Sequence, residues 1–253
     1  MKIALLGAGN VATHLSKALI KKGHPVIQVW SNTRQNAVDL ALAIGADSIA
    51  SVLDLSLDAE LVIIAVKDDA IEEVAKQIPA TSKAIVVHTS GSTAMAVLRG
   101  RTHYGVLYPL QTFSKAVDVD FDDVPLFLEA SDPNTEIKLS ELASQLSARV
   151  QLADSAQRLI LHVAAVFACN FTNHFYSIGE HLLKQQNLDF NLLRPLIAET
   201  AEKALKYAPS SVQTGPAVRL DVQTMNKHLE ALTGHPDLQE LYRSVSQNIV
   251  KNC

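Results

Sequence analysis

The chain has 253 residues, of which 48% are hydrophobic and 19% are charged. This length suits two domains, and the composition excludes a wholly disordered protein. There are 22 Lys and Arg residues against 26 Asp and Glu, without a basic run, which argues against nucleic-acid binding. The longest apolar run, Leu159–Cys169, is too short for a membrane span. Cys169 and Cys253 fit neither a disulfide framework nor a CxxC motif. We therefore expect a soluble, cytoplasmic protein without nucleic-acid or membrane partners.

The first part of the chain alternates between short apolar runs and amphipathic stretches. The runs that read as strands are Ile3–Leu6, Val26–Trp30, Leu61–Val66, Ala84–Val87 and Pro125–Leu128. The stretches that read as helices are Val11–Lys22, Asn36–Ile44, Ala70–Ile78, Thr93–Leu98 and Glu136–Ser147. The strand-like runs are continuously apolar, as expected of parallel strands that are covered on both faces. This alternation predicts an α/β fold with a doubly wound, mostly parallel sheet over residues 1–152.

The second part of the chain reads as helix almost throughout. The predicted helices are Ser155–Gln186, Phe190–Tyr207, Thr224–Leu232 and Asp237–Lys251. An irregular stretch rich in Pro, Ser and Gly, residues 208–221, separates the second of these helices from the third. We therefore predict an all-α C-terminal domain over residues 153–253.

A glycine-rich turn follows the first predicted strand and opens the first predicted helix. It reads Gly7-Ala8-Gly9-Asn10-Val11-Ala12, a GxGxxA pattern. Its first glycine permits the tight turn, its second lets the backbone approach a pyrophosphate, and its final alanine allows close helix packing. Free N–H groups at the helix N-terminus add an anion site. The pattern predicts a Rossmann-like dinucleotide site; a turn that has lost its ligand, or one for another nucleotide such as a methyl donor, is the alternative.

The end of the second predicted strand indicates which dinucleotide binds. An NAD site usually carries an acidic residue here for the ribose 2′-hydroxyl. This chain has Ser31, Asn32, Thr33 and Arg34, and no carboxylate before Asp39. Hydroxyl groups and a guanidinium suit a 2′-phosphate, so we predict NADP(H), with NADPH bound more tightly than NADH. Arg34 as an ordinary surface cation remains the alternative.

Loops after later predicted strands supply further candidate site residues, because ligands of open α/β sheets lie at the carboxyl ends of the strands. We expect Val66, His88, Ser90 and Gly91 to contact the cofactor, the last three near the nicotinamide. The alternative for these three is a plain polar turn. In the next loop Gln111 and Thr112 are candidate substrate ligands, unless Pro109 makes that loop a purely geometric element.

Polar side chains interrupt the apolar face of the long predicted helix. At about 100° per residue, His162 and Asn173 fall within roughly 20° of each other, with Asn170 about 60° from Asn173. We predict that His162 donates a proton, that Asn170 orients the substrate and that Asn173 contacts it, with structural roles as the alternative. Arg219 is a further candidate substrate ligand, although Asp221 is a possible partner for it. No two histidines are spaced i, i+4, and we predict no metal site.

The chain resembles a family of NADP oxidoreductases that join a Rossmann-like domain to a helical C-terminal domain of unassigned function. It is also similar in layout to pyrroline-5-carboxylate reductase and to deazaflavin-dependent NADP oxidoreductases. The stretches that carry the resemblance are Gly7–Ala12, His88–Ser92, Pro109–Phe113, His162–Asn173 and Gly215–His228. The family's His-Pro-Leu-Gln pattern begins here with Tyr108, and Leu220 replaces the second glycine of its Gly-Pro-x-x-Arg-Gly-Asp pattern. The replaced histidine puts a catalytic role for position 108 in doubt.

The resemblance and the motifs together predict an NADP(H)-dependent oxidoreductase that transfers a hydride between nicotinamide and a small carbonyl or imine substrate. A non-catalytic dinucleotide-binding or sensing protein is the second hypothesis. The related hydroxyacid dehydrogenases carry Lys-x-x-x-Asn on their long helix, and Val166 stands at the lysine position here. The missing lysine is the main support for this second hypothesis. We also predict a homodimer formed through the helical domain, because the long helix is apolar on nearly every face.

Overall fold

The computed structural model describes residues 1–114 and 117–252, and its central feature is a β-sheet. Within these residues the strand order is β3-β2-β1-β4-β5-β6-β7-β8. The strands are β1 (Ile3–Leu6), β2 (Val26–Trp30), β3 (Asp47–Ser48), β4 (Leu61–Ile64), β5 (Ile85–His88), β6 (Tyr104–Pro109), β7 (Leu126–Ala130) and β8 (Val150–Leu152). Neighbouring strands run parallel except β6 and β7, which are antiparallel. The prediction of a doubly wound, mostly parallel sheet is confirmed.

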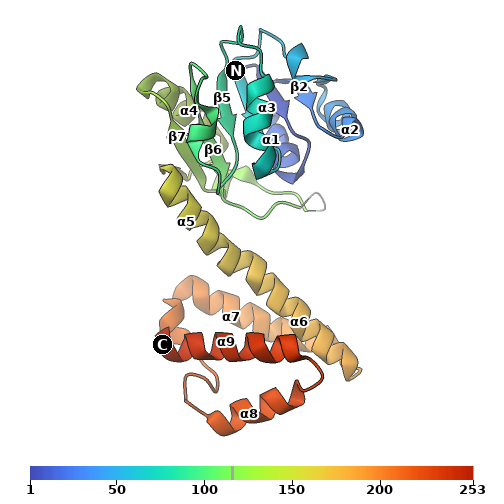
Figure 1. The fold of residues 1–253 in the computed structure, drawn as a ribbon, viewed down its shortest axis with the longest axis vertical. Helices are drawn as coiled ribbons and strands as arrows, with labels where there is room; N and C mark the ends of the chain where they lie inside the picture. Colours follow the sequence, from blue (N-terminus) through green and yellow to red (C-terminus); the bar gives the residue numbers. More distant parts are fainter. Residues whose placement is uncertain (115–116, 253) are drawn as a thin grey trace. The chain divides into compact units, whose positions relative to one another are not determined.

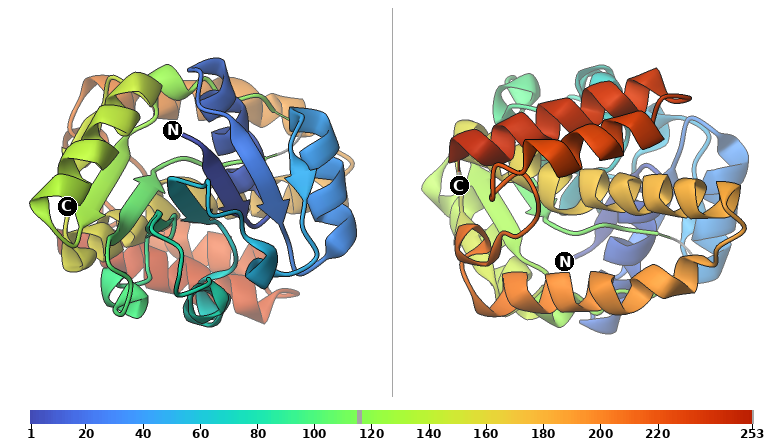
Figure 2. Two further views of the ribbon diagram at one scale, coloured as in Figure 1. Left: turned by 90° about the horizontal axis from the view of Figure 1, so that it is seen from above. Right: turned by 90° about the horizontal axis from the view of Figure 1, so that it is seen from below.

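Helices cover both faces of this sheet (Figure 1). One face carries α1 (Asn10–Lys21), α2 (Arg34–Ile44) and α4 (Pro133–Leu146). The other carries α3 (Ile71–Gln77) with the short 3₁₀ segments η1 (Val52–Asp54) and η3 (Met95–Leu98). The 3₁₀ segments η2 (Asp68–Ala70) and η4 (Phe121–Asp123) lie in connecting loops. Figure 2 shows α2 and α4 near opposite edges of the sheet, beside β2 and β7.

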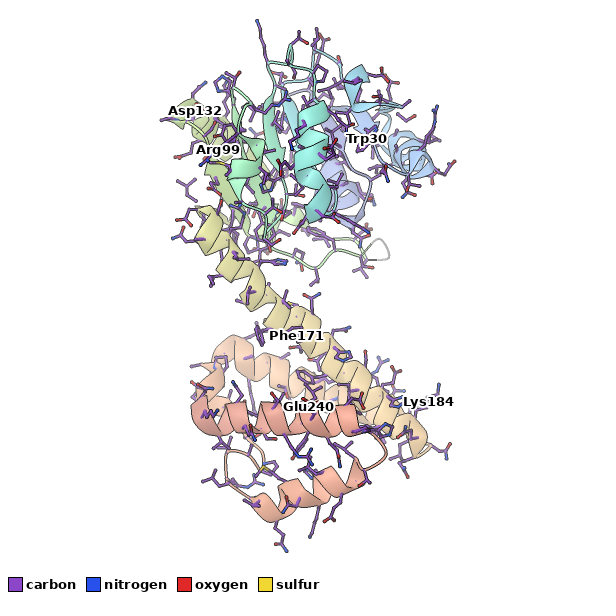
Figure 3. The ribbon with its side chains drawn as sticks, viewed as in Figure 1. Trp30, Arg99, Asp132, Phe171, Lys184 and Glu240 are labelled. Atoms are coloured by element: carbon purple, nitrogen blue, oxygen red, sulfur yellow. The ribbon has the colours of Figure 1, made fainter. Side chains whose placement is uncertain are left out.

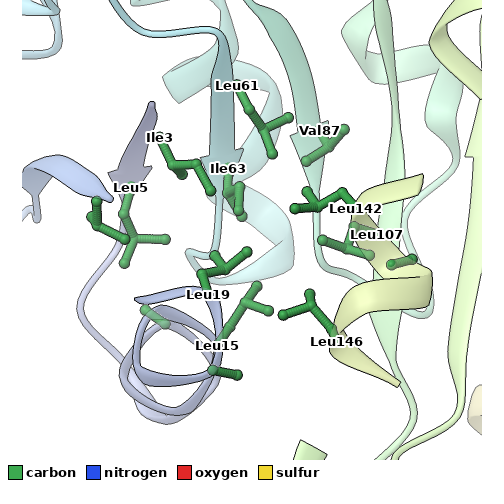
Figure 4. Close-up of a cluster of buried hydrophobic side chains, with 14 of the residues drawn as sticks. Ile3, Leu5, Leu15, Leu19, Leu61, Ile63, Val87, Leu107, Leu142 and Leu146 are labelled. Atoms are coloured by element: carbon green, nitrogen blue, oxygen red, sulfur yellow. The ribbon is translucent and has the colours of Figure 1, made fainter. Parts of the chain in front are cut away.

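Buried aliphatic side chains hold these layers together. Along β1, Ile3 and Leu5 pack on the α1 side, whereas Ala4 and Leu6 pack on the α3 side. All four are fully buried, which explains why the strand reads as a continuous apolar run. Leu15 and Leu19 of α1 meet this sheet surface in the cluster of Figure 4. The helix that follows the glycine motif is therefore packed firmly against the sheet.

The remaining chain is helical, as predicted. It comprises α5 (Ser155–Ala165), the π-helical segment η5 (Val166–Phe171), α6 (Thr172–Gln185), η6 (Phe190–Leu193), α7 (Arg194–Lys206), η7 (Pro209–Val212), α8 (Val222–Ala231) and α9 (Pro236–Asn252). The single long predicted helix is thus interrupted by a π-helical turn. A capping box between Asp154 and Gln157 fixes the start of α5.

The chain divides into two compact units, Met1–His174 and Phe175–Cys253. The sheet ends at Leu152, and α5 belongs to the first unit because it packs on that sheet through Arg158. A functional domain boundary at residue 152 remains a prediction. None of the helices among the described residues is long and apolar enough to cross a membrane.

Candidate functional site

A cavity of about 1270 Å³ lies at the carboxyl ends of the parallel strands, and all of its lining belongs to the first unit. Its walls come from the segments that follow β1, β2, β4 and β5, from the end of β6 and the loop after it, and from α5 and η5. The segments that line it most fully are Gly7–Val11, Trp30–Thr33, Ala65–Asp68, Thr89–Gly91 and Tyr108–Phe113. This is the edge at which open α/β sheets bind ligands.

The turn after β1 has the geometry of a dinucleotide cradle. Gly7 has φ +130°, and a Cβ atom there would lie 2.2 Å from the carbonyl oxygen of Ala65. At Gly9 a Cβ atom would meet nothing within 4 Å, so this position faces open space. Gly9 is also the N-cap of α1 and makes no side-chain cap, which leaves the first N–H groups of the helix available for phosphate oxygens. These residues fit a bound pyrophosphate.

The loop after β6 is tied to the same helix. The side-chain amide of Asn10 donates to the carbonyl oxygen of Phe113 at 2.9 Å. Nε2 of His14 lies 2.9 Å from the carbonyl oxygen of Ser114, and the His14 ring stacks on Phe113. These contacts hold Gln111 and Thr112 at the cavity wall, where sequence reasoning placed them as substrate ligands. His14 carried no sequence signal beyond its proximity to the glycine turn, whereas Phe113 ends one of the stretches that carry the family resemblance.

The end of β2 supplies the polar residues expected for the adenosine side. Ser31, Asn32 and Thr33 line the cavity, whereas Arg34 is exposed at the start of α2 and lies outside the described lining. A contact between Arg34 and a 2′-phosphate therefore stays a prediction, which the length and flexibility of an arginine side chain allow.

Tyr108 and His162 form a polar pair in the wall of the cavity. The Tyr108 hydroxyl lies 3.1 Å from Nδ1 of His162. Both side chains close over Gly91, where a Cβ atom would lie 2.8 Å from the Tyr108 hydroxyl and 2.9 Å from Cβ of His162. Burial raises the pKa of Tyr108 to about 12, although the nearby Arg158 charge opposes this shift. Tyr108 is therefore a neutral hydroxyl group at physiological pH.

The π-helical turn decides which polar residues of the long helix share the cavity wall. In this segment the Thr172 hydroxyl donates to the carbonyl oxygen of Phe167, five residues back. Each residue of a π-helix turns the chain by less than the α-helical 100°. Asn170 is therefore rotated back towards the face of His162, and both line the cavity. The same smaller rotation turns Asn173 away from the face of His162, and the described cavity lining does not include Asn173.

Comparison with known proteins identifies the family. The chain is 42% identical to a candidate NADP oxidoreductase from Bacteroides fragilis whose crystal structure is known. The alignment covers 99% of this chain and 98% of that one, with a TM-score of 0.91. The chain belongs to this family of NADP oxidoreductases. Residues 2–91 also match the family described as NADP oxidoreductase, coenzyme F420-dependent, and residues 124–249 match a domain of unknown function, DUF2520.

More distant structures share the fold of this oxidoreductase. A protein from Thermotoga maritima is 22% identical, with 98% of this chain and 97% of that chain covered and a TM-score of 0.72. A reductive aminase from Aspergillus terreus, in complex with NADPH and ethyl-5-oxohexanoate, is 15% identical, with 99% and 93% covered and a TM-score of 0.74. No curated protein matches the sequence. The predictions of an NADP oxidoreductase and of NADP(H) as its cofactor are confirmed.

Not every predicted residue of the oxidoreductase lies at the cavity. Ala8, Val11, Val66, Ser90 and Gly91 line it, whereas the described lining does not include His88. The His88 ring is fully buried, and its Nδ1 accepts from the backbone N–H of Ser90 at 3.2 Å. Burial lowers the pKa of His88 to about 4, and the charge of Arg158 acts in the same direction. Its neutral ring shapes the Ser90 turn from behind.

Arg219 lies in the second unit and is likewise outside the described cavity lining. The alternative role weighed for it from sequence was an interaction with Asp221. The carboxylate of Asp221 caps α8 by accepting from the backbone N–H and the hydroxyl of Thr224, at 3.0 and 2.8 Å. The Arg219 charge helps to lower the pKa of this carboxyl, after the two hydrogen bonds from Thr224.

Arg158 is a functional-site residue that sequence reasoning missed. Its side chain is fully buried and forms an ion pair with Glu129 of β7. It also donates to the carbonyl oxygens of Ser90, at 3.1 Å, and Thr93, at 2.6 Å. Arg158 therefore fixes the loop that carries Ser90 and Gly91 to the cavity. One arginine in an apolar helix gives no signal of this role, since its acceptors come from the loop after β5 and from β7, both distant in the sequence.

Proposed function

We propose that this NADP oxidoreductase reduces the C=O or C=N bond of a small substrate in the cavity of the first unit. The observation that carries the proposal is the Tyr108–His162 pair, which sits over Gly91 in the same cavity that begins at the glycine turn. Imine reductases and a reductive aminase of the same fold support including imines in the substrate class.

The glycine turn and the strand ends would hold the cofactor, which supplies the hydride when bound. Its pyrophosphate would lie over the turn that contains Gly7 and Gly9, and Val66 would contact it from the end of β4. Ser31, Asn32, Thr33 and Arg34 would bind the 2′-phosphate. The nicotinamide would then lie near Ser90 and Gly91, with His88 supporting their turn from the interior.

The substrate would lie beside the long helix. Reduction of a carbonyl or imine requires a proton as well as a hydride, and histidine is suited to donate one near neutral pH. We assign this role to His162 and the orientation of the substrate heteroatom to Asn170, which shares its wall. Gln111 and Thr112 complete the polar lining on the opposite loop. Substrate contacts from Asn173 and Arg219 stay predictions, because neither residue lines the described cavity of one chain.

Two substitutions test this assignment. NADPH oxidation is first measured against a panel of small ketones, aldehydes and cyclic imines. His162→Gln and Asn170→Ala should then lower kcat by about 10²–10⁴-fold while NADPH binding is kept. His174→Gln, on the same helix but outside the described lining, is the matched control and should keep wild-type turnover. Wild-type turnover in His162→Gln and Asn170→Ala, or no turnover of any carbonyl or imine, would refute the proposal.

We also propose that two copies of the oxidoreductase pair through their helical parts, in the cytoplasm. In this proposal residues 1–152 bind the cofactor, whereas residues 153–253 contribute to the substrate site and form the interface. The apolar side chains of the long helix are uncovered in one chain: Ile160 is 67% exposed and Phe167 64%. Phe171, labelled in Figure 3, and Phe175 are each 45% exposed. Ala217 is the sole buried residue among the described residues of the second unit. A second copy would bury these surfaces.

Sedimentation tests the pairing. At micromolar concentration the wild type should sediment as about twice the 27.4 kDa of one chain. Phe167→Glu should shift it towards the single chain, since a charge at an apolar interface must be desolvated. Leu42→Glu, at a position on α2 that is 79% exposed, is the control and should not. A wild type that sediments only as a 27.4 kDa species would contradict the dimer.

A further inference from the structure

The hydrogen bond between Tyr108 and His162 leaves one nitrogen of the imidazole free to act. A neutral imidazole carries a proton on one nitrogen and a lone pair on the other. Tyr108 occupies Nδ1, and no other hydrogen bond of the His162 ring is seen among the described residues. If the hydroxyl donates to Nδ1, then Nε2 carries the ring proton. The hydrogen bond from Tyr108 thus sets the tautomer of the His162 ring.

We propose that Tyr108 and His162 act as one proton-donating pair, in which Nε2 of His162 protonates the substrate and Tyr108 replaces that proton at Nδ1. This inference rests on the proposed reduction of a C=O or C=N bond and deepens it. Tyr108 thus positions the His162 ring and also holds the proton that moves to Nδ1. Sequence comparison does not point to this pair, because the family that the chain resembles has histidine at position 108.

Protons and electrons balance in this step. The substrate carbon accepts a hydride, and the π electron pair of its C=O or C=N bond moves onto the heteroatom. The Nε2–H bond of His162 breaks and a new O–H or N–H bond forms at that heteroatom. The hydroxyl proton of Tyr108 moves to Nδ1, which leaves a neutral imidazole and a tyrosinate. After product leaves, solvent protonates Nε2 and the Nδ1 proton returns to the tyrosinate oxygen, which restores the resting pair.

The surroundings of the pair suit a protonated Tyr108 in the resting state. The ring is 7% exposed and packs near Phe127. Burial raises its pKa, the Arg158 charge lowers it and the Asp68 carboxylate raises it. Other ionisable groups that line the same cavity are Lys67, Glu73 and Cys169. The Arg158 cation, held by Glu129, also stabilises the tyrosinate that forms during the step.

The pair has a distinct pH dependence. An isolated imidazole donates a proton readily only as the imidazolium, which is lost above pH about 6.5. The pair starts from a neutral imidazole and a phenol, so its donating form persists until the phenol ionises. A phenol whose pKa is raised ionises at higher pH than an ordinary one, which extends the plateau upwards. The kcat of the wild type should therefore stay level from pH 6.5 to 9.

Tyr108→Phe removes the hydroxyl and keeps the ring that packs over Gly91. We expect its kcat to match the wild type near pH 6 and to fall above pH about 6.5. At pH 8.5 the kcat should be about a hundredfold lower, because an isolated imidazole is roughly 1% charged two units above its pKa. Tyr104→Phe, on the same strand but outside the described cavity lining, is the control and should keep the wild-type profile. A Tyr108→Phe profile that follows the wild type would overturn the pair.

A measurement without cofactor or substrate gives an independent answer. Nitrogen-15 NMR at pH 8, with the His162 signals assigned by their loss in His162→Gln, should show Nε2 protonated in the wild type and a mixture of tautomers in Tyr108→Phe. A wild-type His162 protonated at Nδ1 would refute the proposed direction of the hydrogen bond and with it the pair. If the tautomer is as expected but no carbonyl or imine is reduced, the proposed function fails and the hydrogen-bonded pair stands.

Discussion

Glu129→Gln should lower the stability of the first unit by about 3–5 kcal/mol, because it strands the charge of a buried arginine. Arg158 is fully buried and Glu129 supplies the negative charge that faces it. The Ser155 hydroxyl also donates to Glu129, at 2.8 Å, so the substitution disturbs a connected network rather than one contact. For a unit of this size the loss corresponds to a fall in Tm on the order of 10 °C, measurable by circular dichroism.

Two further variants separate the buried pair from ordinary surface charge. Glu199→Gln breaks an exposed i, i+4 ion pair with Lys203 and should cost less than about 0.5 kcal/mol. The double variant Glu129→Leu with Arg158→Met removes both charges and should recover part of the loss. Recovery stays incomplete because the carbonyl oxygens of Ser90 and Thr93 lose their donor. Equal Tm changes in Glu129→Gln and Glu199→Gln would contradict this account.

The sheet and the glycine turn were predictable because their signals are local in the sequence. β1 and β2 begin and end at the predicted residues, since continuous apolar runs mark strands that are covered on both faces. The two-residue β3 and the three-residue β8 are too short to give such runs. β6 was missed because Gly105 and Pro109 interrupt its apolar pattern.

The polar wall formed by Tyr108, His162 and Asn170 was less predictable because contacts between distant segments define it. Tyr108 and His162 are 54 residues apart, and nothing in the sequence around either indicates the other. Helical periodicity placed His162 and Asn173 on one face, but the π-helical turn between them replaces Asn173 by Asn170. A π-helix has no reliable sequence signature, so an extrapolation at 100° per residue fails beyond it.

The glycine turn should respond differently to alanine at its two glycines. In Gly7→Ala the new Cβ would lie 2.2 Å from the Ala65 carbonyl oxygen at φ +130°, so even the free protein should lose about 2–4 kcal/mol of stability. In Gly9→Ala the new Cβ meets nothing within 4 Å, and stability should fall by less than about 1 kcal/mol. That methyl group would nevertheless occupy the space expected for the pyrophosphate.

NADPH and NADH titrations by fluorescence complete the comparison. Gly9→Ala should weaken both cofactors by about a hundredfold or more, roughly 2.7 kcal/mol, because the pyrophosphate is common to them. Arg34→Ala should weaken NADPH by about ten- to a hundredfold and leave NADH unchanged, because the 2′-phosphate is present only in NADPH. Unchanged NADPH affinity in Gly9→Ala would place the pyrophosphate elsewhere. Equal losses for the two cofactors in Arg34→Ala would remove Arg34 from the 2′-phosphate site. The contact with the phosphate would then fall to Ser31, Asn32 and Thr33, which already line the cavity.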